Sequence, residues 1–382
     1  MIPYIVVYLV SFVLVWLAIR KKEIKWLYRL LVSVSLLLPS LLAGFRNYGV
    51  GTDTMVYGQR YFEYAHRMSI PRFFEITDCE WGYGLLVFGV SHFTNNIFWM
   101  YFLIQLIIMV FVWLSIEEYL DDYYKPYALM VYYLLFYSFS LNLMRQTIAM
   151  AIMLFSFRYI RRNKLIPFLI CLAAAILFHK TSVISFVLFP IYQLSYTKDK
   201  NEIKQRSIVG KYIHEIITKI RKPLLFLGVV AVFLIVLNGA RIITFLHFYL
   251  DDFYAQYNNL KAGGGNTWRY NLFMIPLLLF TGFSIKKNNP DYIFYIVISV
   301  IQLIMFRLKL ISTESYRMCL YFAFFMVICL PKNIEIMNNP NNRRISRWIS
   351  MAIMWLYWYV FFVVIGYNQT HPYVSSILHI GR

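Results

Sequence analysis

Apolar blocks of about 15 to 20 residues, separated by short polar stretches, recur along the whole 382-residue sequence. An α-helix of this length crosses a hydrocarbon core of about 30 Å and satisfies its own backbone polar groups there. Hydrophobic residues make up 60% of the chain and charged residues only 14%, which is unusual for a soluble domain. The sequence therefore predicts an all-α fold, a polytopic bundle of transmembrane helices.

The pattern predicts about twelve spans within a single transmembrane domain that covers residues 1–382. The predicted spans are 2–19, 29–45, 97–116, 126–141, 144–160, 165–179, 181–196, 223–240, 270–285, 291–306, 316–331 and 347–366. The first block has its basic residues behind it and no small-residue cleavage site, so we expect a retained span rather than a signal peptide. The apolar block 81–93 is too short to cross, and we expect a re-entrant or interfacial helix there.

The distribution of Lys and Arg predicts the orientation of the bundle. If 20–29 is cytoplasmic and the spans alternate, 24 of the 37 Lys and Arg fall on the cytoplasmic side, as the positive-inside bias requires. The large external loops are then 46–96 and 241–269. The basic segment 197–222 is cytoplasmic, and we expect it to lie on anionic lipid headgroups, with protein docking as the alternative.

The formal net charge of +19 does not indicate nucleic-acid binding, because the basic residues are divided among many short loops. The four cysteines lack the spacing of a metal site, so neither zinc nor a disulfide framework is predicted. No cofactor is expected, with a metal role for the external pair Asp251-Asp252 as the minority alternative. The sequence shows no internal repeat and no soluble catalytic domain. Any chemistry is therefore expected in loops and helix ends at the external membrane boundary.

The first candidate site consists of three residues in the segment from Arg46 to Tyr57. Arg46 offers a planar fork for anions, Asp53 a proton acceptor and Tyr57 an aromatic hydroxyl, and two glycines allow the backbone to turn tightly between them. The alternative for Asp53 is that it caps a helix.

Glu80, beside Trp81 and Tyr83, is a second candidate. Partial removal from water raises the pKa of a carboxylate, which would suit a general base. The neighbouring aromatic residues have an alternative explanation, since Trp and Tyr are common at membrane interfaces regardless of function. We nevertheless predict weak sugar contacts for Tyr83 and for Trp268 in the second external loop.

Further polar residues interrupt the apolar spans. Arg145 and Gln146 begin the fifth span, where ionisable groups are costly and usually functional, although snorkelling to headgroups is an alternative. His179 lies in a tight external connection and could exchange a proton near neutral pH, or could be a packing residue. Arg317 begins the eleventh span, where neighbouring Glu314 could simply neutralise it. Three arginines on one membrane face would suit a diphosphate.

Several of these stretches together resemble the EpsG family of bacterial exopolysaccharide proteins, which is similar to the Wzy-type polymerases of O-antigen and capsule synthesis. The resemblance is carried by the segment from Arg46 to Tyr57, Glu80-Trp81-Gly82-Tyr83, Arg145-Gln146, Phe178-His179-Lys180-Thr181 and Tyr316-Arg317.

The resemblance implies a metal-independent membrane glycosyltransferase with a GT-C-like architecture, in the bacterial inner membrane with its active face external. Its substrate would be oligosaccharide repeat units linked through diphosphate to undecaprenol, joined into polymer at the outer leaflet. Its other expected partners are membrane lipids, a chain-length regulator and a flippase, with no nucleic acid. A lipid-linked glycan ligase and an oligosaccharide flippase or export component remain the alternatives.

Individual roles follow from the same resemblance. The donor diphosphate would be bound by Arg46, Tyr57, Arg145, Gln146 and Arg317. Asp53 or Glu80 would deprotonate the acceptor hydroxyl, with His179 as a further possible base, and the sequence leaves open which of the three acts.

Overall fold

The computed structural model describes residues 1–195, 275, 277, 291–306 and 313–381, and within these residues it contains helices and no β-strand. The α-helices are α1 (Ile2–Arg20), α2 (Lys25–Phe45), α3 (Tyr61–Arg67), α4 (Ile70–Thr77), α5 (Trp81–Phe93), α6 (Phe98–Tyr119), α7 (Lys125–Tyr132), α8 (Ser138–Asn142), α9 (Met144–Arg161), α10 (Leu165–Phe178), α11 (Leu188–Ser195), α16 (Tyr292–Phe306), α17 (Thr313–Ala323), α18 (Met326–Glu335) and α19 (Pro340–Trp358). Short π- or 3-10 segments are η1 (Thr54–Arg60), η2 (Asp122–Tyr124), η3 (Tyr133–Tyr137), η4 (Lys180–Val187), η7 (Tyr359–Val364) and η8 (Tyr367–Gln369). The all-α prediction is confirmed for the described part of the chain.

The chain forms two compact units. The first comprises Met1–Val183, Phe324–Glu335 and Asn339–Arg382, and the second comprises Ile184–Ala323 and Ile336–Asn338. The first unit therefore holds α1 to α10, α18 and α19, and the second holds α11, α16 and α17.

Five described helices are long and apolar enough to cross a membrane: Ile2–Arg20, Lys25–Phe45, Phe98–Tyr119, Arg317–Glu335 and Pro340–Val364. Each overlaps a predicted span. The total of about twelve is not confirmed, and the predicted spans 223–240 and most of 270–285 lie outside the described residues, as do the segments 197–222 and 241–269. The short block 81–93 forms α5 with the predicted bounds, and its 13 residues are too few for a full crossing.

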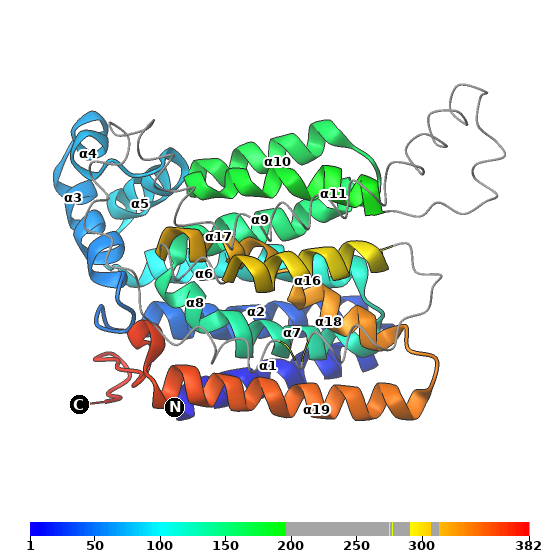
Figure 1. The fold of residues 1–382 in the computed structure, drawn as a ribbon. Helices are drawn as coiled ribbons and strands as arrows, with labels where there is room; N and C mark the ends of the chain where they lie inside the picture. The colour runs from blue at the N-terminus through cyan, green and yellow to red at the C-terminus, as the bar shows by residue number, and fades with distance from the viewer. Residues whose placement is uncertain (196–274, 276, 278–290, 307–312, 382) are drawn as a thin grey trace, which may run out of the picture. The chain divides into compact units, whose positions relative to one another are not determined.

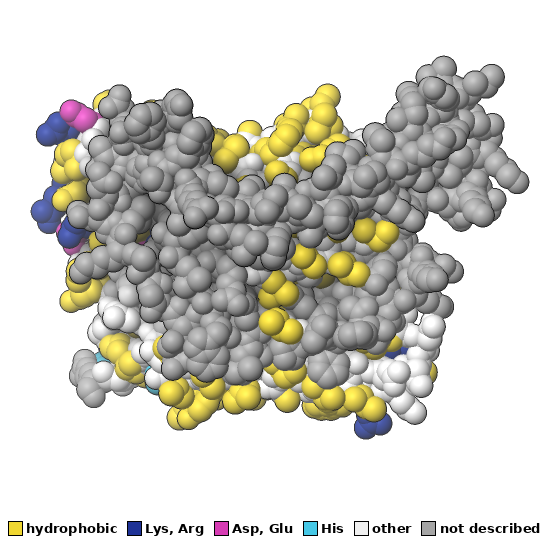
Figure 2. Space-filling model, in the orientation of Figure 1, with side chains coloured by type: hydrophobic (Ala, Val, Ile, Leu, Met, Phe, Trp, Pro, Cys, Tyr) yellow, Lys and Arg dark blue, Asp and Glu magenta, His cyan; other side chains and the backbone are white. Residues whose placement is uncertain are grey.

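In the first unit, α3, α4 and α5 gather at one end of the long helices, whereas α1, α2, α6, α7, α9 and α19 run lengthwise (Figure 1). On the face shown in Figure 2, Lys, Arg, Asp and Glu gather at the end that carries α3 and α4. Along α1 the exposed side chains before Arg20 are apolar, among them Val6, Leu9 and Val13. Such a surface suits lipid rather than water.

A proline explains one polar contact between the first two helices. Pro39 lies inside α2 and lacks an N–H, so the carbonyl of Ser35 loses its usual helical partner. The hydroxyl of Ser11 in α1 donates to that carbonyl at 3.1 Å, and both serines are buried. The Ser35 carbonyl therefore keeps a hydrogen-bond partner in an apolar environment, and this bond holds α1 against α2.

Candidate active site

The first turn of α5 lies against the end of α10 because residue 82 is glycine. A side-chain Cβ at Gly82 would lie 2.8 Å from the backbone oxygen of Leu177, which is closer than Cβ atoms approach such atoms. The missing side chain lets the residue before α5, Glu80, meet His179, the residue after α10. A local feature of sequence thus joins two candidates that lie 99 positions apart.

Glu80, Arg145 and His179 form a buried charged cluster, which we call the Glu80 cluster. The Arg145 Nη1 donates to Glu80 Oε2 at 2.5 Å, and His179 Nδ1 lies 3.0 Å from Glu80 Oε1. The backbone N–H of Lys180 also donates to Oε1, at 3.3 Å. The side chains of Glu80, His179 and Arg145 are 7%, 11% and 15% exposed. Both carboxylate oxygens are therefore satisfied with little help from solvent.

The environment of Glu80 lowers its pKa to about 2. Burial by itself raises the pKa, but the hydrogen bond from His179 and the charge of Arg145 together outweigh burial. The sequence predicted a raised pKa from burial alone, and that prediction is wrong because it omitted both partners. Glu80 is thus a stable carboxylate at neutral pH and a weak base.

His179 presents one nitrogen to Glu80 and keeps the other one unused. A carboxylate only accepts hydrogen bonds, so the Nδ1 that faces it carries a proton, and Nε2 is an acceptor whenever the ring is neutral. Among the described residues this buried Nε2 has no hydrogen-bond partner. A positioned imidazole with an unused basic nitrogen is the arrangement that a general base requires.

Two tyrosines support Arg145 from the other side. Its guanidinium lies 3.9 Å from the ring centroid of Tyr57 and 5.8 Å from that of Tyr83. The Tyr83 hydroxyl donates to the backbone oxygen of Tyr57 at 2.7 Å, and Tyr83 is fully buried. Because Tyr83 is fully buried, it is better placed to support Arg145 than to contact a sugar. Tyr57 is half-buried.

Arg46 is buried without a countercharge. It is 4% exposed, its guanidinium lies 4.5 Å from the ring centroid of Tyr101, and its Nη2 lies 3.3 Å from the sulfur of Met144. Within the described ranges no acidic residue pairs with it, and its Nε and Nη1 have no hydrogen-bond partner. Because an unpaired buried charge is costly, Arg46 is well suited to bind an anion.

A polar pocket of about 350 Å³ adjoins Arg46. Its hydrogen-bonding side chains come from Arg46, Asn47, Gln59, Glu63, Asn95, Asn96 and Ser376. It also has aromatic walls formed by Phe45, Tyr48, Phe62 and Phe98. The Gln59 Nε2 donates to Glu63 at 3.0 Å, and the buried Gln59 Oε1 has no partner within the described part of the chain.

Asp53 immediately precedes η1, and its backbone N–H donates to Asn142 Oδ1 at 2.8 Å. Just before it, Gly51 has a φ of +109°, a conformation that suits glycine. The backbone N–H of Gly51 donates to Gln369 at 3.0 Å, so the C-terminal segment holds this turn in place. Sequence analysis does not predict this role for Asn142, although the residue lies three positions before Arg145.

Three further candidate residues, Gln146, Arg317 and Trp268, do not belong to the Glu80 cluster. Gln146 is buried in α9 beside Arg145. Arg317 belongs to α17 in the second unit and is partly exposed, so its contribution stays a prediction. Trp268 lies outside the described residues. Within the described ranges, no group of three or more His, Cys, Asp or Glu could hold a metal ion.

The fold and the site together define a helical protein with several apolar helices and a buried charged cluster at one end of them. The model of the EpsG family matches residues 26–375, so this chain belongs to the EpsG family, a Wzy-like polymerase family. Membership suggests a membrane protein with a polysaccharide polymerase-like role. No curated protein and no solved structure matches the chain.

Proposed function

We propose that this protein is a glycosyltransferase of the bacterial inner membrane that joins oligosaccharide repeat units linked through diphosphate to undecaprenol, acting at the outer leaflet. The EpsG family supports the polymerase-like role. The observation that carries the mechanism is the orientation of His179, with Nδ1 on the Glu80 carboxylate and a buried Nε2 that has no partner in the described part of the chain.

In the proposed reaction, a hydroxyl oxygen of the incoming unit attacks the anomeric carbon of the donor sugar. A glycosidic C–O bond forms, the C–O bond to the diphosphate breaks, and its electron pair leaves with undecaprenyl diphosphate. His179 Nε2 accepts the hydroxyl proton, and the resulting imidazolium lies beside the Glu80 carboxylate, which stabilises it. This assigns the base to His179, while Glu80 orients the ring.

Charge stabilisation is assigned to the arginines. Diphosphate is already a good leaving group, and preorganised cations lower the energy of the charge that develops on it. Arg46 has the stronger need for an anion, since Arg145 already pairs with Glu80. Both are connected to η1 through a tyrosine: Arg145 stacks on Tyr57, and Arg46 stacks on Tyr101, whose hydroxyl donates to Thr54 at 3.3 Å. Arg317 is proposed as a third contact.

The polar pocket beside Arg46 is proposed to hold a sugar of the substrate. Amide and carboxylate groups such as those of Gln59, Asn95 and Glu63 can bond to sugar hydroxyls, while the neighbouring aromatic rings provide apolar faces. Membrane lipids, a chain-length regulator and a flippase are proposed partners of the protein. No metal or other cofactor is proposed for the reaction.

The test uses purified full-length protein and lipid-diphosphate-linked repeat units, without ATP or nucleotide sugar, and resolves the products on a gel. A ladder spaced by whole repeat units is expected, and EDTA should leave it unchanged. Transfer of one unit to a different acceptor would indicate the ligase instead. No product from several chemically distinct repeat units, with the protein folded, would contradict the proposal, and EDTA sensitivity reversed by one divalent ion would overturn its metal-free form.

A further inference from the structure

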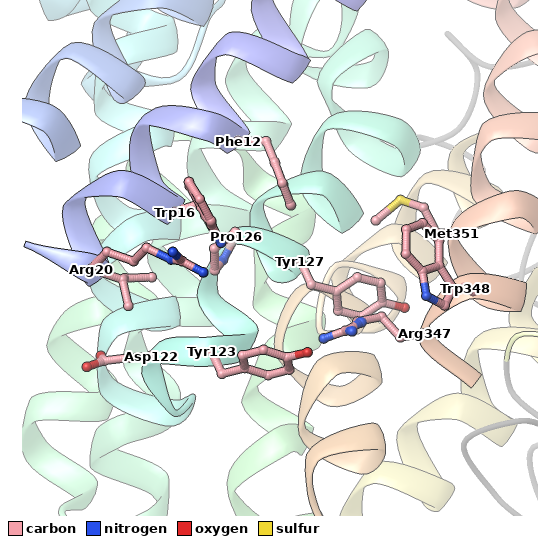
Figure 3. A pocket seen from close by; sticks show the side chains of 11 residues that line it. Phe12, Trp16, Arg20, Asp122, Tyr123, Pro126, Tyr127, Arg347, Trp348 and Met351 are labelled. Atoms are coloured by element: carbon pink, nitrogen blue, oxygen red, sulfur yellow. The ribbon is translucent and has the colours of Figure 1, made fainter. Parts of the chain in front are cut away.

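A second pocket lies at the opposite end of the first unit from the Glu80 cluster. It has a volume of about 310 Å³ and is lined by side chains of α1, α7 and α19 together with η2. Its apolar walls include Phe12 and Trp16 of α1, Tyr127 of α7, and Trp348 and Met351 of α19 (Figure 3). We call it the α1–α19 pocket.

The rim of the α1–α19 pocket carries two arginines whose charges are not compensated by an acid. Arg20 lies 4.0 Å from the ring centroid of Trp16, and Arg347 lies 4.7 Å from that of Tyr123. Neither arginine has an ion pair within the described residues. Figure 3 shows them on either side of Tyr123.

The one acid that lines the pocket already has cationic partners. Asp122 bonds to Lys22 at 2.7 Å and to Lys125 at 2.7 Å. Lys125 also contacts Glu117 at 3.0 Å and is 3% exposed, so this network is part of the packed structure. The charge left over at the pocket is therefore positive.

The position of the pocket matches a membrane–water boundary. Both α1 and the helical stretch Pro340–Val364 are long and apolar enough to span, and Arg20 is the last residue of α1. Three aromatic residues of the lining, Trp16, Tyr123 and Trp348, are 41%, 64% and 64% exposed. Exposed Trp and Tyr are typical of the headgroup level, and the predicted orientation makes this end cytoplasmic.

We propose that the α1–α19 pocket binds an anionic phospholipid of the inner leaflet. Its phosphate would contact the arginine-bearing rim, and part of an acyl chain would lie against Phe12 and Met351. Guanidinium groups bind phosphate oxygens directionally, and basic pockets between helices on the cytoplasmic side are suited to anionic headgroups. Uncompensated cations over an apolar floor match this amphipathic ligand better than a soluble anion or an uncharged lipid. The site is independent of the proposed polymerase activity.

The experiment measures lipid retention by native mass spectrometry of the full-length protein, purified from vesicles of equal phosphatidylglycerol and phosphatidylcholine. The wild-type protein is expected to retain phosphatidylglycerol at least about tenfold over phosphatidylcholine, because one good charged contact contributes that much. The variant Arg20→Gln/Arg347→Gln should lose this preference.

The matched control is Lys21→Gln/Arg344→Gln, which removes the same charge from two exposed residues outside the pocket lining. It should keep the wild-type preference. A second variant, Met351→Trp, fills the floor without changing charge and should lower retention of phosphatidylglycerol. Equal retention of both lipids by the wild type, or the same loss in both double variants, would overturn the proposal. The proposal would also be overturned if Arg20→Gln/Arg347→Gln and Met351→Trp both retained phosphatidylglycerol as the wild type does.

Discussion

The Glu80 cluster and the α1–α19 pocket, at the two ends of the first unit, differ in whether their arginines have an acidic partner. At one end, Arg145 is 15% exposed, pairs with a carboxylate at 2.5 Å and stacks on a tyrosine. At the other end, Arg20 and Arg347 stack on aromatic rings, and no acid among the described residues pairs with them. A buried cation needs a partner inside the protein, whereas a cation at the boundary can rely on water or lipid headgroups.

Arg46 departs from this rule, because it is both buried and unpaired within the described part of the chain. This exception distinguishes it from Arg145, whose partner is already present. The comparison thus separates an arginine that maintains the site from one that is suited to receive the substrate. Four experiments test the side of this comparison that the Glu80 cluster represents.

The largest effect is expected from Arg145→Ala. It leaves Glu80 buried with one partner fewer, and breaking a buried pair typically costs about 3–5 kcal/mol. Product should disappear and the unfolding temperature in detergent should fall. Arg162→Ala is the control, since Arg162 contacts Glu118 while 53% exposed and should change stability by less than about 1 kcal/mol. Similar losses of stability in both variants would show that burial does not determine how much each ion pair stabilises the protein.

His179→Ala should abolish most activity, and it should also lower the unfolding temperature, because it removes a hydrogen-bond partner of buried Glu80. Removal of a general base typically costs about 10²–10⁴-fold in rate, measured here from the initial rate of ladder formation. His92→Ala is the matched control, because His92 is exposed and its Nδ1 lies within hydrogen-bond distance of groups in its own helix, the Phe88 carbonyl oxygen and the Ser91 hydroxyl. Full activity of the His179 variant would remove it as the base.

Gly82→Ala should disturb the site through packing. The new Cβ would collide with the backbone of Leu177, forcing α5 away from α10 and Glu80 away from His179, at about 1–3 kcal/mol. Rate and stability should therefore fall together. Gly89→Ala in the same helix is the control, since its new Cβ would meet nothing within 4 Å. Equal behaviour of the two variants would contradict the close-approach argument.

The smallest effect concerns pH. Partners lower the pKa of Glu80 from 4.5 to about 2, so its contribution to stability is present above about pH 4.5 and is lost as the pH falls toward 2. At about pH 3.5 the loss should be on the order of 1 kcal/mol. The difference in unfolding free energy between wild type and Glu80→Gln should shrink over this range. A constant difference would show that the cluster does not hold the carboxylate ionised.

The predicted spans and the helices agree best where the signal is local. The blocks 2–19, 29–45 and 97–116 became α1, α2 and α6, and the short block 81–93 became α5. Hydropathy over a window of consecutive residues is enough for such predictions, because the bilayer acts on each helix separately. The same reasoning identified Glu80, Arg145 and His179, since polar residues at the ends of apolar blocks stand out.

Hydropathy over consecutive residues could not predict which of these polar residues contact one another. The partners of Glu80 lie 65 and 99 residues away, and their contact depends on how α5 packs against α10 and α9. That packing reversed the predicted direction of the Glu80 pKa and buried Tyr83 under Arg145. It also left Arg46 without an acidic partner among the described residues.

The sequence by itself determined a helical membrane protein of the EpsG type and the residues that stand out within it. Only the tertiary structure decided which of those residues meet, which nitrogen of His179 is left unused, and which arginines already have a partner. The physical reason is that the two effects depend on residues at different separations along the sequence. Transfer of a helix into lipid depends on adjacent residues, whereas the energy of a buried charge depends on whatever the fold brings within a few ångströms of it.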